Sequence, residues 1–137
     1  ALIKQNEKGK TIDVKNIYGK DHADSFLMVE SGRAAAFVMD DILLAGLIAS
    51  SKNPADFAIV GPSLRDEPYG VMLRKDDAPF KALVDKTLIG LMKSGEAEKL
   101  YTKWFTNPVP PRNVNLNFAM SPAVKAAFAT PTDKGVE

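Results

Sequence analysis

The most informative part of the sequence is residues 32–41, Gly-Arg-Ala-Ala-Ala-Phe-Val-Met-Asp-Asp. Its central six residues, 34–39, form an unbroken apolar run between Gly32-Arg33 and Asp40-Asp41. A continuous apolar run of this length is typical of a β-strand that is buried on both faces, as in a parallel sheet. We therefore expect a parallel strand at 34–39 with the aspartate pair at its carboxyl end.

The segments on both sides of this run alternate between strand and helix patterns. Residues 11–17 alternate apolar and polar side chains, which predicts a strand, and residues 23–31 are then predicted to form a short helix. After the aspartates, we expect a helix over 42–50 and another short buried strand at 57–60. This order of strand, helix, strand, helix and strand indicates βαβ units of a doubly wound α/β sheet.

A polar segment flanked by prolines, residues 62–69, separates this pattern from a second one. Such a segment is typical of a connection between structural parts. Beyond it the sequence predicts a strand at 69–74 and three helices. The helices are expected from a cap at Asp76 or Asp77 as far as Gly95, over 96–105, and from Ser121-Pro122 to Phe128.

Composition excludes several classes of protein. The 137 residues include 18 Lys and Arg against 17 Asp and Glu, a net charge of +1, so we expect no nucleic-acid partner. There is no Cys and a single His, which excludes disulfide scaffolds, Cys-zinc sites, thiol catalysis and multi-His metal sites. The apolar runs are too short to span a bilayer. We expect neither a metal nor a cofactor.

Asp40 is the first candidate binding residue. It follows the predicted strand 34–39, and ligands of open α/β sheets bind beyond the carboxyl ends of the strands. A partly desolvated carboxylate there suits a ligand ammonium group, because exclusion of water strengthens the attraction. Asp41 is expected to cap the helix that starts at Ile42. The alternative is that both aspartates only cap this helix.

His22 is the second candidate. It lies between the predicted strand 11–17 and the helix 23–31, at the same edge of the sheet as Asp40. A histidine beside free backbone N–H groups at a helix N-terminus is a natural anion site. The alternative is a solvated loop histidine. Together, Asp40 and His22 would bind the two charged ends of a zwitterion.

Catalytic alternatives have less support from the sequence. There is no Gly-x-Ser-x-Gly elbow and no Gly-rich phosphate loop. An acid–base pair of His22 and Asp40 is conceivable, but no nucleophile accompanies it. We therefore expect no enzymatic activity.

Several motifs resemble one known family. The segments that carry the resemblance are 20–26, 30–34 and 37–41, then 69–77, 94–105, and finally 107–111 with 115–118. They are similar to the periplasmic glutamate/aspartate-binding proteins, which belong to the polar amino-acid family of ABC-transporter solute-binding proteins. The resemblance covers essentially the whole chain.

The resemblance implies a two-lobed α/β fold of the type II periplasmic-binding-protein kind, of which this chain is the C-terminal portion. Residues 1–61 would be the second half of lobe 2, 62–69 the hinge, 70–105 the return segment and helices of lobe 1, and 106–137 a tail. The family's arginine clamp for the ligand α-carboxylate has no matching motif here, so it is expected before residue 1.

The resemblance also implies function and site roles. Asp40 matches the aspartate that binds the ligand α-ammonium, and His22 the histidine that contacts the acidic side chain. The implied function is binding of L-glutamate or L-aspartate between the lobes in the periplasm and delivery to the membrane permease of an ABC importer. The same scaffold also carries dehydratase-like enzymes and sensor domains. An isolated fragment is expected to associate with a complementary chain or to swap domains.

Overall fold

The computed structural model describes residues 14–135 of the chain. The chain divides into two compact units, Ala1–Leu64 and Arg65–Glu137, which are described separately below. The division falls within the segment 62–69. The assignment of the parts to two lobes stays a prediction.

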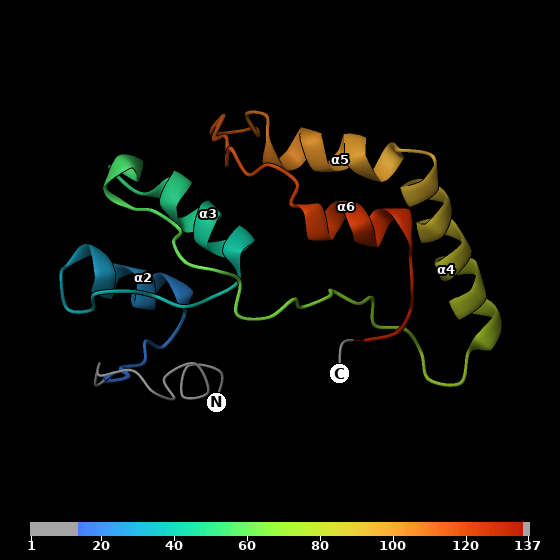
Figure 1. Ribbon diagram of the computed structural model, residues 1–137, viewed down its shortest axis with the longest axis horizontal. Coiled ribbons are helices and arrows are strands. Elements are labelled where there is room, and N and C mark those ends of the chain that lie inside the picture. The colour runs from blue at the N-terminus through green and yellow to red at the C-terminus, as the bar shows by residue number, and fades with distance from the viewer. Residues whose placement is uncertain (1–13, 136–137) are drawn as a thin grey trace. The chain divides into compact units, whose positions relative to one another are not determined.

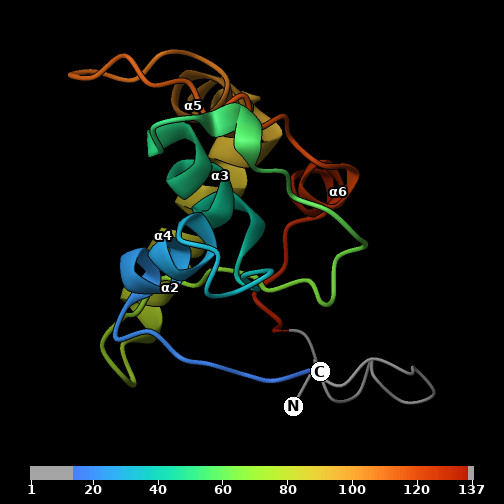
Figure 2. The same cartoon turned by 90° about the vertical axis from the view of Figure 1, so that its left-hand side faces the viewer.

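Within residues 14–64, the first unit has two α-helices and one short 3-10 helix. These are α2 (His22–Glu30), α3 (Asp41–Ser50) and η1 (Pro54–Asp56). After a turn at residues 31–33, the link between α2 and α3 runs without regular secondary structure (Figure 1, Figure 2). The small apolar core of the first unit includes Phe26, Met28 and Ala45. The ring centroids of Phe26 and Phe57 lie 5.0 Å apart. Both helices lie where the sequence predicts them.

The start of α2 follows from local chemistry. The Asp21 side chain accepts a hydrogen bond from the Asp24 amide at 2.8 Å, and the Asp24 carboxylate accepts one from the Lys20 amide at 3.0 Å. This reciprocal arrangement satisfies amides that a helix N-terminus leaves open. Gly19 lies so close that a Cβ atom there would be 2.7 Å from the Ser25 nitrogen. A side chain at position 19 would therefore displace the first turn.

The second unit, as described from residue 65 to residue 135, has the helices α4 (Ala78–Lys93), α5 (Glu96–Phe105) and α6 (Pro122–Ala129). The side chains of Asp77 and Ser121 cap α4 and α6, accepting from the Phe80 and Val124 amides at 3.2 Å each. Gly95 has a φ of 81° and joins α4 to α5. The chain changes direction there, so that the two helices run in different directions (Figure 1). Helix α4 packs against both α5 and α6. These helices confirm the sequence prediction.

The predicted strands are not formed among residues 14–135. The segments 34–39, 57–60 and 69–74 carry no β-ladder, and residues 14–17 of the first predicted strand do not form one either. Residues 11–13 lie outside the described residues. The β-pairing in this part of the chain is an isolated antiparallel bridge between Val109 and Val114. The predicted parallel sheet is therefore not formed among these residues, because a strand exists only where another strand supplies its hydrogen-bond partners.

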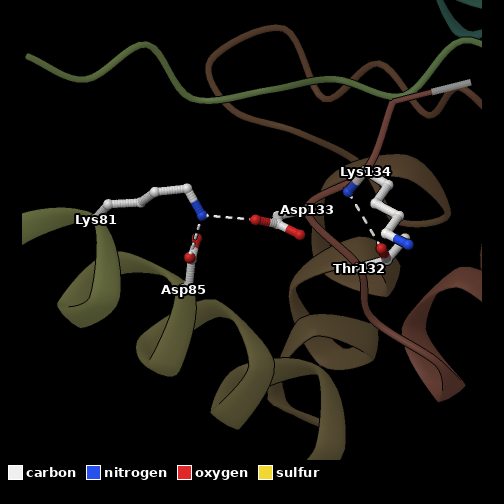
Figure 3. A network of polar contacts seen from close by, with 5 residues as sticks. All are labelled: Lys81, Asp85, Thr132, Asp133 and Lys134. Carbon is white, nitrogen blue, oxygen red and sulfur yellow. Dashed lines mark hydrogen bonds and ion pairs between the residues drawn. The ribbon is translucent and has the colours of Figure 1, made fainter. Parts of the chain in front are cut away.

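A polar network ties the C-terminal segment to α4 (Figure 3). The Lys81 ammonium lies 2.6 Å from Asp85 Oδ2 and 2.7 Å from Asp133 Oδ2. The hydrogen bond to Asp133, followed by the one to Asp85, raises the pKa of Lys81 above its usual value of 10.5. The same bond lowers the pKa of Asp133 below its usual 3.8. Beside the network, the Lys134 amide donates to Thr132 Oγ1 at 3.1 Å.

Replacing Asp133 by asparagine is expected to return the pKa of Lys81 towards its usual value, because the larger of its two carboxylate contacts is lost. Asp85→Asn is the matched control and should produce a smaller fall. NMR titration of the Lys81 side chain measures both. The Asp133 contribution to stability should be complete above about pH 4 and fade as the pH falls through its lowered pKa. A Lys81 pKa that is unchanged in Asp133→Asn would contradict the network.

Candidate ligand-binding site

His22 is the first residue of α2 and its side chain is exposed. Within the described part of the chain, the backbone N–H groups of His22 and Ala23 have no hydrogen-bond partner, whereas the Asp24 amide is taken by Asp21. The next amide, that of Ser25, donates to the Asp21 carbonyl oxygen at 3.0 Å. Free amides at a helix start, with an imidazole beside them, can hold an anionic oxygen. The two nearby carboxylates are already engaged by backbone amides.

Asp40 occupies the N-cap position of α3 and is half-buried. Its carbonyl oxygen accepts hydrogen bonds from the Leu43 and Leu44 amides at 3.1 and 3.0 Å, but its carboxylate makes no cap hydrogen bond. The cap of α3 was assigned to Asp41 from the sequence, and this assignment is wrong by one position. Asp41 is the first helical residue, and its Oδ1 accepts from the Ile42 amide at 2.7 Å.

Both candidates lie at the N-terminus of a helix in the first unit. His22 is the first residue of α2, and Asp40 is the N-cap of α3. They are not hydrogen-bonded or ion-paired to each other, since His22 has no such contact with any described side chain. The acid–base pair considered from the sequence is therefore not formed.

A hollow that the sequence did not indicate lies along α5. It has a volume of about 590 Å³ and is lined by Gly95, Glu98, Lys99, Thr102, Lys103 and Asn107. The hollow is open to solvent, and its walls carry charges of both signs. In the sequence, residues at this helical spacing look the same whether they line a hollow or an ordinary solvated helix face. It belongs to the second unit and contains neither candidate residue.

The described residues offer neither a metal-binding cluster nor a membrane-crossing helix. Between residues 14 and 135, no group of three His, Cys, Asp or Glu side chains is placed to hold a metal ion. Over the same range, none of the helices has the length and apolar character needed to cross a membrane.

Sequence comparison connects the chain with bacterial solute-binding proteins. It is 52% identical over 135 residues to the glutamate/aspartate import solute-binding protein of Escherichia coli (strain K12), covering 98% of this chain and 44% of the relative. It is 48% identical over 136 residues to the L-glutamate/L-aspartate-binding protein of Pseudomonas aeruginosa, covering 99% and 45%. A lysine/arginine/ornithine-binding periplasmic protein of Escherichia coli is 31% identical over 110 residues. A scan against protein-family models gives no match.

The alignment covers this chain almost completely but each relative only in part. Nearly all of this chain aligns, whereas the chain spans a little less than half the length of the two glutamate/aspartate relatives. Identity of about 50% over 135 residues indicates common ancestry and a common fold. Along nearly its whole length, the chain is therefore similar to one part of the glutamate/aspartate solute-binding proteins.

Proposed function

We propose that this chain is the C-terminal part of a solute-binding protein that binds L-glutamate or L-aspartate in the periplasm and delivers it to the permease of an ABC importer. The observation that carries the proposal is the 48–52% identity, over nearly the whole chain, to three proteins named for glutamate and aspartate. The protein closes on its ligand and releases it unchanged. It carries out no catalysis.

The proposed site combines the two helix N-termini of the first unit. Asp40 binds the α-ammonium group of the ligand, and this role is supported by its half-buried position at the N-terminus of α3. His22 and the free amides at the start of α2 bind the side-chain carboxylate of the ligand. The α-carboxylate is bound by residues of the protein outside this chain.

The proposed domain organisation has two lobes. Residues 1–61 form the second half of lobe 2, and residues 62–69 form the hinge. Residues 70–105 form the return segment and helices of lobe 1, and residues 106–137 form the tail. The division of the structure between Leu64 and Arg65 falls inside the proposed crossover and supports this division of roles.

A chimera tests the proposal, with this chain replacing the matching part of the Escherichia coli relative. Calorimetry should give saturable binding of glutamate and aspartate, and much weaker binding of glutamine. Chromatography of the incubated ligand should recover it unchanged. A reaction product would instead favour the dehydratase-like alternative, and a chimera that folds but binds neither acidic amino acid would contradict the proposal.

The 137-residue chain alone is expected to bind glutamate weakly or not at all. It lacks the proposed α-carboxylate partners, and a ligand held by one lobe loses the contacts that closure supplies. Calorimetry on the isolated chain checks this directly. A Kd on the order of 1 µM, which corresponds to about 8 kcal/mol of binding free energy, would contradict the expectation.

A further inference from the structure

The connection between α5 and α6, residues 106–121, is long but is held in place by its own hydrogen bonds. The side-chain amides of Asn107 and Asn115 donate to backbone carbonyl oxygens at the C-terminal end of α5, at 3.1 and 2.9 Å. An antiparallel bridge between Val109 and Val114 closes the loop. Connections of this length without regular structure are uncommon unless they are flexible linkers or serve a function, and these hydrogen bonds do not fit a flexible linker.

The tip of this loop, residues 110–113, is exposed and carries a cation. The loop projects away from the helices of the second unit (Figure 2). The Arg112 guanidinium makes no hydrogen bond or ion pair with any residue between 14 and 135. Because the loop is already ordered, a partner that binds this guanidinium through a carboxylate does not first have to order the backbone.

The hollow along α5 lies beside the base of the loop, because Asn107 lines it together with residues of the helix. Its volume of about 590 Å³ can receive side chains of a partner. Of its charged side chains, Lys99 is paired with Glu96 at 2.7 Å. Lys103 and Glu98 form no ion pair within the described part of the chain. With Arg112, this surface therefore has two unpaired cations and one unpaired anion.

The hollow and the apolar side chains of α5 lie on opposite faces of the helix. The apolar face carries Leu100, Tyr101, Trp104 and Phe105. Each of these four follows, by two positions, a residue that lines the hollow. Two positions correspond to about 200° of rotation around an α-helix. The hollow therefore stays accessible to a partner whatever packs on the apolar face.

We propose that the hollow along α5 and the loop 106–121 together form a docking surface for a carboxylate-bearing segment of the importer's permease. Lys103 and Arg112 bind carboxylates of the partner through charge-assisted hydrogen bonds, and the hollow receives the side chains between them. Glu98 disfavours a segment that is acidic throughout and so helps to set its orientation. The choice of the permease as partner rests on the proposed function.

Sedimentation with proteoliposomes tests the proposal, using the chimera and the permease of the Escherichia coli glutamate/aspartate importer. The double variant Lys103→Glu/Arg112→Glu should bind the permease at least about 10-fold more weakly, because both cations are reversed. Its affinity for glutamate, measured by calorimetry, should stay within about 2-fold of the wild type, since the proposed ligand residues lie in the first unit. Raising the salt concentration should weaken docking of the wild type more than that of the double variant.

Two further variants complete the experiment. Lys86→Glu/Lys125→Glu is the matched control, because it makes the same change of charge at exposed positions of α4 and α6, and it should dock as the wild type does. Lys103→Gln/Arg112→Gln removes both charges without reversing them and should lie between the wild type and the double glutamate variant.

Three results would overturn the proposal: equal docking by the wild type and Lys103→Glu/Arg112→Glu, an equal loss in the control variant, or no docking by the wild type. Binding to vesicles without permease, lost in the same double variant, would assign the surface to lipid headgroups and also overturn it. A chimera that docks through these residues but binds no glutamate contradicts only the proposed function. A chimera that binds glutamate and docks equally in every variant contradicts only the docking surface.

Discussion

Asp40→Asn is expected to weaken binding of glutamate and aspartate to the chimera by roughly 100-fold, about 3 kcal/mol. The substitution keeps the size of the side chain and removes its charge. In the closed protein the ligand ammonium would then be desolvated without a counter-charge, and this desolvation is the source of the loss. Calorimetry with both amino acids measures it.

The neighbouring aspartate supplies the matched control. Asp41 carries the same charge one residue away, but its carboxylate accepts the Ile42 amide at 2.7 Å, a role that an asparagine oxygen can take over. Asp41→Asn should therefore change the affinity by no more than about 2-fold. Because the Asp40 carboxylate caps nothing in α3, circular dichroism should show the helix intact in both variants. Equal losses in the two variants would remove Asp40 from the site.

The helices could be predicted from the sequence because their signals are local. Asp21, Asp77 and Ser121 each cap a helix through an amide three residues away, and Gly95 takes the left-handed conformation that ends α4. Such contacts are complete within one turn of chain. Residue type and spacing therefore suffice to place them.

The pairing of β-strands, in contrast, could not be predicted from local signals in the sequence. The apolar run at 34–39 has the composition of a buried strand, but pairing depends on segments distant in sequence or outside the chain, and composition does not supply them. The same limit applies to the site. The sequence located Asp40 and His22 at helix starts, where free amides and polar side chains coincide, but it misplaced the cap of α3 by one residue because Asp40 and Asp41 are identical in type.

His22→Ala is expected to weaken binding of acidic ligands selectively. In the chimera, glutamate should lose roughly 10-fold or more in affinity, because a charge-assisted hydrogen bond to a carboxylate contributes about 1.5–3 kcal/mol. Glutamine presents a neutral amide at the same place and should lose no more than about 3-fold. Competition calorimetry with both ligands measures the ratio.

The free amides at the start of α2 set the size of this effect. They remain in His22→Ala, since Asp21 still caps the helix through the Asp24 amide, so glutamate binding should be reduced but not abolished. His22→Gln keeps a hydrogen-bond donor without the imidazole and should lie between the wild type and His22→Ala for glutamate. Equal losses for glutamate and glutamine would place His22 outside the side-chain pocket. Selectivity for acidic ligands would then come from the α2 amides alone, which a substitution of His22 leaves in place.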